Sequence, residues 1–182
     1  MSTFNVPTKD QVSENNQAIF NQLEKGLGFV PNLYATLAHS DNALSNFLTF
    51  ANSKTSLSNK EKEAINLAVS EVNRCVYCLS AHTAISKMNG FNDSEILELR
   101  TGKADFNSKL NALARLAQNV AINRGKVDND VLDNFFNEGY TKENLADAIN
   151  VIGEITITNY FHNTTKIPVD FPVTQPLELQ TV

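Results

Sequence analysis

The sequence predicts an all-α fold, and two observations support that prediction. Apolar residues recur at the helical spacing i, i+3, i+4, i+7 along most of the 182 residues. The seven glycines and five prolines are few for this length, and most lie between the periodic segments, where such residues end helices. No alternating strand pattern competes convincingly, although Ile155-Thr-Ile-Thr158 is locally β-like.

The first three helices are expected between Asp41 and Gly90. One follows Asp41 or Asn42, and the next opens with a capping box formed by Ser58 and Glu61. Their apolar positions are Leu44, Phe47, Leu48 and Ala51 in one helix, and Ile65, Ala68, Val69 and Val72 in the other. A third helix is expected from an N-cap near Asn73 to Gly90 as the C′ residue, and it carries both cysteines.

Four more helices and an extended arm complete the predicted fold. A short helix is expected over residues 93–100, a long one closes at Gly125, another ends before Gly139, and Thr141 caps the last. The apolar faces of the last three contain Phe106, Leu110, Leu113, Ala117 and Val120, then Val131, Leu132, Phe135 and Phe136, then Leu145, Ala148, Ile149, Ile152 and Ile155. Residues 166–182 contain three prolines and no helical pattern, so we expect a C-terminal arm that lies over the surface or a neighbouring subunit.

Composition limits the classes of function. With 42% hydrophobic residues, the chain fits a single domain over 1–182, with a helical core at about 10–165. A net charge of −5 and the absence of any Lys or Arg block argue against nucleic acid as a partner. The N-terminus has no cationic and apolar leader pattern, and no apolar run approaches the roughly 18 residues that span a bilayer. We therefore expect a cytoplasmic protein without a membrane segment.

Cys75 and Cys78 are the only cysteines, and His82 follows the second by four positions. On one helix these three residues fall on a single stripe, with the cysteine Cα atoms roughly 5 to 6 Å apart, inside the range of a disulfide. In a reducing compartment a lone C-x-x-C is typical of catalytic, redox or metal chemistry rather than of a structural bridge. A thiol of pKa about 8.5 becomes nucleophilic when a helix N-terminus or an imidazole lowers that pKa, and His82 is positioned to supply such a base.

Two upstream glutamates are candidates to orient His82. Glu71 precedes Cys75 by one helical turn, and Glu63 lies two turns before Glu71. A carboxylate beside His82 would hold the imidazole tautomer and raise its basicity. The sequence leaves the choice between the two open.

The stretch from Lys62 to His82 resembles the signature of the AhpD-like alkylhydroperoxidases, within the carboxymuconolactone decarboxylase superfamily. That signature has a glutamate twelve positions before the first cysteine, a C-x-x-C often with Tyr before its second cysteine, and a histidine four positions later; Glu63 takes the glutamate position. Phe29-Val-Pro-Asn-Leu33 and Leu37-Ala-His-Ser40 resemble the lead-in of the peroxidase-related branch, so the likeness covers roughly residues 25 to 165.

The resemblance implies a bundle of about seven to nine helices and a thiol-dependent peroxidase that reduces hydroperoxides in antioxidant defence. Cys78 would attack the peroxide, Cys75 would resolve the sulfenic acid to a disulfide, His82 would activate Cys78, and Glu63 would be the outer member of the relay. The family assembles as trimers or hexamers with the site near subunit contacts, and its reductant is a dithiol, thioredoxin-like or lipoyl-bearing protein. No cofactor or metal is expected. Tyr77 stands where the best-studied member has a histidine, and its pKa near 10 suits a hydrogen-bond donor rather than a base.

Other functions remain as alternatives. A zinc site would use both cysteines, His82 and possibly Glu71, but the second ligand knuckle typical of structural zinc is missing. A redox sensor or disulfide-exchange protein would carry the same cysteines without peroxide turnover, and a decarboxylase of the same superfamily would lack the C-x-x-C pair. A further interpretation is that the two cysteines have no chemical role and only pack a core helix.

The remaining histidines are expected to be structural. His39 lies where a short helix ends. His162 lies beside Tyr160 and Phe161 near the end of the last helix, where core or interface packing explains it.

Overall fold

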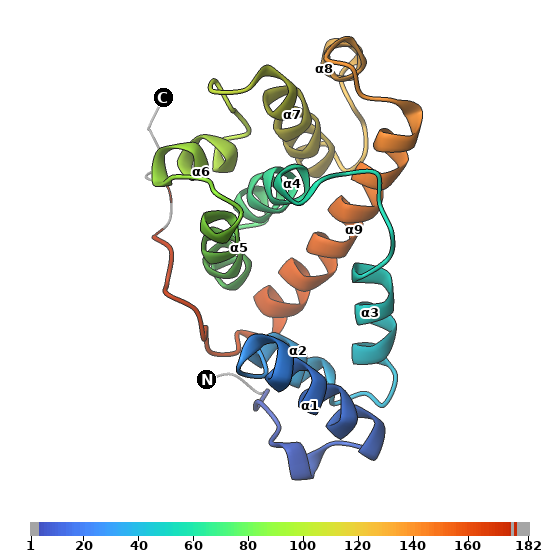
Figure 1. Ribbon diagram of the computed structural model, residues 1–182, viewed down its shortest axis with the longest axis vertical. Helices are drawn as coiled ribbons and strands as arrows, with labels where there is room; N and C mark the ends of the chain where they lie inside the picture. Colours follow the sequence, from blue (N-terminus) through green and yellow to red (C-terminus); the bar gives the residue numbers. More distant parts are fainter. Residues whose placement is uncertain (1–3, 176, 178–182) are drawn as a thin grey trace.

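The computed structural model describes residues 4–175 and 177. In this part of the chain there are nine α-helices, one 3-10 helix and no strand, which confirms the predicted fold class (Figure 1). The elements are η1 (Lys9–Gln11), α1 (Glu14–Leu27), α2 (Asn32–Leu37), α3 (Ala43–Ala51), α4 (Asn59–Val72), α5 (Val76–Met88), α6 (Asp93–Arg100), α7 (Ser108–Ile122), α8 (Asn129–Asn137) and α9 (Lys142–Thr165).

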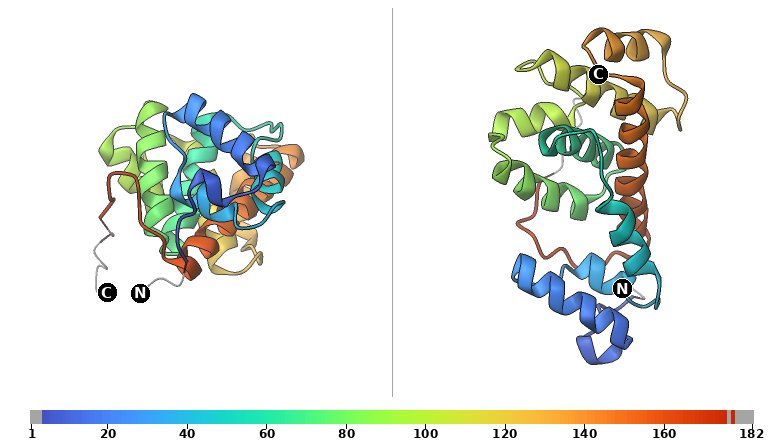
Figure 2. Two further views of the ribbon diagram at one scale, coloured as in Figure 1. Left: turned by 90° about the horizontal axis from the view of Figure 1, so that it is seen from below. Right: turned by 45° about the vertical axis from the view of Figure 1, so that its right-hand side comes forward.

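Helix α4 is the centre of the bundle. It packs against α5, α6, α7 and α9, and every residue from Glu63 to Ser70 is buried. Helix α9, the longest, runs along the molecule from α7 and α8 at one end to α1 and α2 at the other (Figures 1 and 2). This buried middle part of α4 has no solvated face, so a polar side chain there such as Glu63 must find partners inside the protein.

The junction between α4 and α5 differs from the expectation. Asn73 is the C-cap of α4 and not the N-cap of the cysteine helix, which begins at Val76 with Cys75 as its N-cap. Arg74 between them has φ of 52°, a left-handed conformation that breaks the helix and reverses the chain. Cys78 and His82 therefore lie one turn apart on α5, while Cys75 caps that helix from outside instead of continuing the stripe.

Other boundaries agree closely with the sequence. Ser58 forms the predicted capping box with Glu61, and Thr141 caps α9. Two apolar positions were placed wrongly: Phe106 precedes α7, whose N-cap is Asn107, and Ile149 is 45% exposed on α9. The β-like stretch 155–158 is helical because it lies inside α9, where packing overrides local propensity.

Residues 166–175 and 177 form the described part of the predicted arm and have neither helix nor strand. The arm lies against its own chain. The backbone N–H of Asn32 donates to Asp170 Oδ2 (2.6 Å), and the backbone N–H of Thr174 donates to Ser80 Oγ (3.0 Å). Arg100 Nη2 donates to the carbonyl of Gln175 (2.9 Å). Residues 176 and 178–182 of the predicted arm lie outside the described residues.

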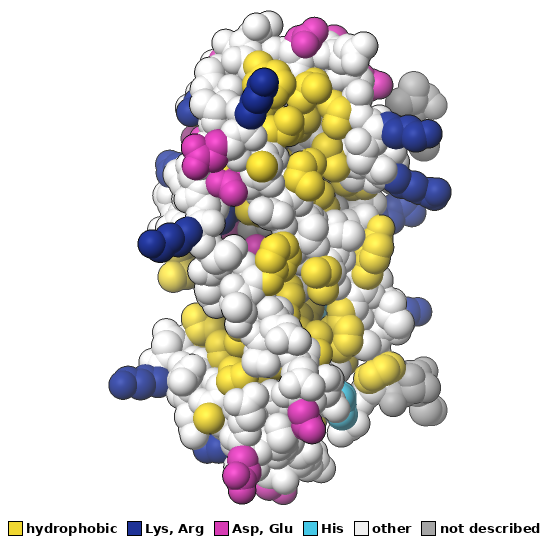
Figure 3. Space-filling view, turned by 90° about the vertical axis from the view of Figure 1, so that its right-hand side faces the viewer, with side chains coloured by type: hydrophobic (Ala, Val, Ile, Leu, Met, Phe, Trp, Pro, Cys, Tyr) yellow, Lys and Arg dark blue, Asp and Glu magenta, His cyan; other side chains and the backbone are white. Residues whose placement is uncertain are grey.

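The surface carries apolar side chains that the bundle leaves uncovered. Figure 3 shows them running down one face of the molecule. Phe50 of α3 is 37% exposed, and Ile157 and Tyr160 of α9 are 48% and 61% exposed. Apolar patches on a surface often mark contacts with other chains, and the predicted trimer or hexamer stays a prediction. In the described part of the chain, no helix combines the length and apolar character needed to cross a bilayer.

Candidate active site

The two cysteines form a buried dithiol at the start of α5. Both are free thiols, 0% and 3% exposed for Cys75 and Cys78, and their Sγ atoms are 2.9 Å apart. The backbone N–H of Cys78 donates to Cys75 Sγ (3.4 Å), which makes that sulfur the side-chain cap of the helix. The pair can therefore close to a disulfide with little movement of the backbone.

The negative charge of this dithiol rests on Cys75. A hydrogen bond from Cys78 is the largest influence on it; together with His162 and the cap N–H it outweighs burial and lowers the pKa of Cys75 to about 5. The pKa of Cys78 is raised well above its usual value by the hydrogen bond and charge of Cys75 and by burial. A thiolate at a helix N-terminus is also favoured by the helix dipole. In the resting dithiol Cys75 is the thiolate and Cys78 keeps its proton.

His82 and Glu63 form a second pair, which links α5 to α4. His82 Nδ1 lies 2.9 Å from Glu63 Oε2, and the carboxylate also accepts from Asn66 Nδ2 (3.2 Å) and Ser86 Oγ (3.3 Å). Burial lowers the pKa of His82, but the Glu63 carboxylate outweighs it, so the net shift is upward. The second candidate, Glu71, makes an ion pair with Arg100 (2.7 Å) instead. Of the two glutamates, Glu63 is the one in contact with His82.

The structure brings the predicted site residues together as two pairs rather than as one chain of hydrogen bonds. The hydrogen bonds of His82 go to Glu63 and Asn66, while Cys78 Sγ is bonded to Thr158 Oγ1 (3.6 Å). Between His82 and the thiols the interaction is electrostatic, since the charge of Cys75 contributes to the raised pKa of His82.

Helix α9 contributes three polar residues that the sequence did not assign to the site. Glu154, Thr158 and His162 are spaced by four and therefore share one face of α9. His162 Nδ1 lies 3.7 Å from Cys75 Sγ, Thr158 bonds Cys78, and Glu154 interacts electrostatically with His82. The available signal was the polar residue at every fourth position along one face of α9. His162 is buried, as the sequence predicted, but its ring contacts the Cys75 thiol.

Tyr77, between the cysteines, connects the cysteine helix to neighbouring parts of the fold. Its hydroxyl accepts a hydrogen bond from the backbone N–H of Leu33 (3.2 Å), and its ring packs against His162 and Phe171. Burial and the nearby Asp170 carboxylate raise the pKa of Tyr77, although the Leu33 N–H opposes the rise. The phenol therefore stays protonated and joins α2 and the arm to the cysteine helix.

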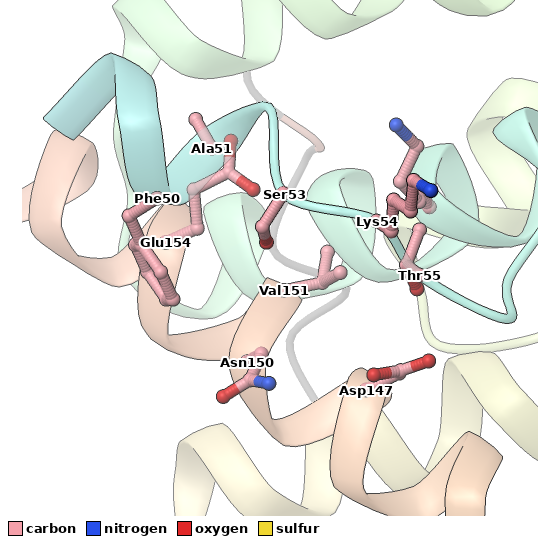
Figure 4. Close-up of a pocket in the computed structure, with 10 residues that line it drawn as sticks. Phe50, Ala51, Ser53, Lys54, Thr55, Asp147, Asn150, Val151 and Glu154 are labelled. Carbon is pink, nitrogen blue, oxygen red and sulfur yellow. The ribbon is translucent and has the colours of Figure 1, made fainter.

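A pocket opens beside this cluster, between the end of α3, the loop that follows it and α9 (Figure 4). Phe50, Lys54 and Asn150 line it, together with Lys62 of α4 and the carboxylate of Glu154. Burial raises the pKa of Glu154, while the charges of His82 and Lys62 oppose that rise. The pocket thus reaches from the surface to a carboxylate within electrostatic range of His82.

Comparison with known proteins agrees with this arrangement. A model of the carboxymuconolactone decarboxylase family matches residues 38–119, which include both cysteines, His82 and Glu63. Over these residues the chain is similar to the carboxymuconolactone decarboxylase family. Among curated proteins, the uncharacterized protein YdfG of Bacillus subtilis is 26% identical over 108 residues, which cover 58% of this chain and 74% of that protein.

Solved structures share the fold at low identity. The AhpD core of a peroxidase-related protein from Ralstonia eutropha JMP134 has a TM-score of 0.83 and 23% identity, covering 93% of this chain and 92% of that one. A peroxidase-related protein from Silicibacter sp. TM1040 has a TM-score of 0.79 and 22% identity, covering 92% and 91%. A variant of the debrominase Bmp8 in complex with 2,3,4-tribromopyrrole has a TM-score of 0.76 and 18% identity, covering 93% and 94%. The predicted AhpD-like bundle is therefore confirmed.

Proposed function

We propose that this protein is a thiol-dependent peroxidase that reduces hydroperoxides through a Cys75–Cys78 dithiol and disulfide cycle. The observation that carries the proposal is the dithiol itself: two free sulfurs 2.9 Å apart, one of which caps a helix and has its pKa lowered to about 5. A low-pKa thiolate beside a second thiol is the arrangement that disulfide-forming enzymes use.

The first step is attack by Cys78 on the peroxide. Cys78 is the slightly more exposed of the two residues, and His82 lies one turn along the same helix. The S–O bond forms as the O–O bond breaks, which leaves Cys78 as a sulfenic acid and releases an alkoxide or hydroxide. Cys78 passes its proton to the Cys75 thiolate, whose sulfur is 2.9 Å away, and the leaving group takes up one proton. His82, which Glu63 keeps protonated to higher pH, delivers the proton to the leaving group.

The second step closes the disulfide. Cys75 attacks the sulfur of the Cys78 sulfenic acid, so the S–S bond forms and the S–O bond breaks, and the departing hydroxide takes up the proton of Cys75 and leaves as water. In sum, two thiols and one hydroperoxide give one disulfide, one alcohol and one water. A dithiol donor then reduces the disulfide by exchange. We propose a thioredoxin-like or lipoyl-bearing protein as this donor, and a cytoplasmic homo-oligomer as the working form.

A second candidate is a redox sensor or exchange protein whose disulfide cycles without peroxide turnover. Burial favours this candidate, because cysteine residues that are 0% and 3% exposed in the single chain leave a bulky peroxide little access. A zinc site would lack Glu71 as its fourth ligand, because that carboxylate is paired with Arg100.

Peroxide consumption tests the proposal. Wild type, Cys75→Ser and Cys78→Ser are each mixed with hydrogen peroxide or tert-butyl hydroperoxide and dithiothreitol, and the zinc content of the same samples is measured. Turnover in the wild type, lost in Cys78→Ser, supports the peroxidase. A disulfide that forms and is reduced without catalytic consumption of peroxide supports the sensor, and stoichiometric zinc without turnover supports a metal site.

A further inference from the structure

We propose that His162 is a catalytic base for Cys75, so that the site has two imidazoles with separate tasks: His82 serves Cys78, and His162 serves the resolving thiol. The inference concerns the protonation of Cys75, and it rests on the proposed function only for the reaction steps in which that thiolate takes part.

The contacts of the ring fix its tautomer. His162 Nε2 lies 3.2 Å from the carbonyl oxygen of Ile167, and His162 Nδ1 lies 3.7 Å from Cys75 Sγ. A carbonyl oxygen only accepts, so Nε2 carries the hydrogen and donates it. The lone pair of Nδ1 is therefore directed at the sulfur in the neutral ring, and it is the atom that accepts the Cys75 proton.

The surroundings leave few other places for that proton. Cys75 is 0% exposed and His162 is 6% exposed, so bulk water does not compete for the contact. The other titratable groups that interact with Cys75 are Cys78 and His82. Cys78 has a raised pKa and holds its own proton in the resting dithiol, and His82 is hydrogen-bonded to Glu63. His162 is the imidazole in hydrogen-bond contact with the Cys75 sulfur.

The proton of Cys75 then has a defined path. Transfer from Cys75 to Nδ1 gives a thiolate beside an imidazolium. When the thiolate attacks the Cys78 sulfenic acid, the S–S bond forms, hydroxide leaves from Cys78 and takes the proton of the imidazolium as water. During reduction the donor thiolate attacks Cys78, a mixed disulfide forms as the S–S bond breaks, and Cys75 leaves as a thiolate. The donor's second thiol then gives its proton to His162 and attacks the mixed disulfide, so that the donor disulfide forms and Cys78 is released and takes up the proton that the donor's first thiol gave up. A leaving thiol of lower pKa leaves faster.

The C-terminal arm supports this geometry. Ile167, whose carbonyl orients the ring, is the second residue after α9 and is 2% exposed. Farther along, Asp170 is bonded to the backbone of Asn32 and Thr174 to Ser80. The arm thus holds the acceptor that sets the His162 tautomer, which gives this segment a task at the site.

The first test measures the Cys75 thiolate directly. In a Cys78→Ser background, the absorbance of the thiolate at 240 nm is followed against pH with His162 intact, with His162→Gln, and with His39→Gln as the matched control. The glutamine amide still donates to the Ile167 carbonyl but offers no base to the sulfur, and His39 is an exposed histidine bonded to Asn5. We expect the midpoint to rise by at least one pH unit in His162→Gln alone, a tenfold drop in the thiolate-to-thiol ratio. A midpoint equal to that of the His39→Gln control overturns the proposal.

The second test needs no substitution at His162. Nitrogen-15 spectra of the wild-type histidine rings are compared between the dithiol and the disulfide. We expect both ring nitrogens of His162 to be protonated in the dithiol and only Nε2 in the disulfide, and the same protonation state in both forms overturns the assignment. Neither test uses peroxide, so the two proposals can fail separately. If both tests give the expected result in a protein that does not consume peroxide, the peroxidase function is refuted and the role of His162 as the base for Cys75 stands.

Discussion

The two site histidines differ in what orients them. His82 is paired with the Glu63 carboxylate and its side chain is 19% exposed, whereas His162 is bonded to a backbone carbonyl and is buried. A carboxylate partner stabilises the imidazolium, so it raises the pKa of His82 and makes that ring a proton donor. A carbonyl partner fixes the tautomer and leaves the other nitrogen free to accept. The hydrogen-bond partner of each imidazole therefore decides whether that ring serves as a proton donor or as a proton acceptor.

The largest expected effect separates the two thiols. Cys78→Ser removes the sulfur that attacks peroxide, so we expect turnover to be abolished. Cys75→Ser leaves that sulfur without a partner, so we expect a single slow oxidation of Cys78, seen as one equivalent of peroxide consumed in rapid mixing. Trapping of the sulfenic acid with dimedone locates the oxidised residue. Full turnover in the Cys78→Ser protein would show that the attack begins at Cys75, and the tasks of the two histidines would then have to be exchanged.

Glu63→Gln tests whether the carboxylate makes His82 a proton donor. General acid catalysis contributes roughly 10²–10⁴-fold to rates, and the glutamine leaves His82 without the charge that favours its protonated form, so we expect turnover to fall by about 10²-fold at pH 7. Because the carboxylate raises the pKa of His82, its loss lowers that pKa. The alkaline limb of the pH–rate profile should therefore move to lower pH. Glu24→Gln, an exposed glutamate of α1, serves as the control, and an unshifted profile in Glu63→Gln would argue against His82 as the acid.

The same pair predicts a pH dependence of stability. The folded-state pKa of His82 is raised above the unfolded value, so the pair contributes stability that is fully present below the unfolded pKa of about 6.5. That contribution is lost as the pH rises through the folded-state pKa. Urea unfolding of wild type and Glu63→Gln between pH 5.5 and 8.5 should show a gap that narrows as the pH rises. A gap that widens with pH would mean that the pair stabilises the protein in another way.

A smaller effect is expected at Thr158, which serves the attacking thiol from α9. Its hydroxyl lies 3.6 Å from Cys78 Sγ and helps to lower the pKa of that thiol against the stronger opposing influences. Thr158→Val removes the hydrogen bond to Cys78, worth about 0.5–1.5 kcal/mol, so we expect turnover to fall by about two- to tenfold. It also removes the bond that the hydroxyl donates to the Ile155 carbonyl (2.9 Å) of its own helix. Thr156→Val is the matched control, because Thr156 bonds only the Ile152 carbonyl of its own helix. Equal losses in both variants would point to a general effect on α9.

Local sequence patterns predicted the helices well because caps and apolar spacing act over a few residues, as at Ser58 and Thr141. They failed at the α4–α5 junction, where the left-handed conformation of Arg74 decides that Cys75 caps the helix. The predicted site residues Glu63, Cys75, Cys78 and His82 were likewise within reach, since they belong to two consecutive helices and the turn that joins them. His162 is 87 positions from Cys75, and only the packing of α9 against α5 brings them together. No pattern along the chain encodes that contact.

The smallest effect on turnover is expected from Tyr77→Phe, which removes a hydroxyl that takes no part in the proposed chemistry. The Leu33 N–H would lose its acceptor in a buried position, at a cost of about 1–3 kcal/mol. We expect near wild-type peroxide turnover and a matching loss in the free energy of urea unfolding. Tyr160→Phe, at a tyrosine that is 61% exposed, should change neither. A large loss of turnover with unchanged stability would instead make Tyr77 a participant in the thiol chemistry, because its ring lies against the base of Cys75.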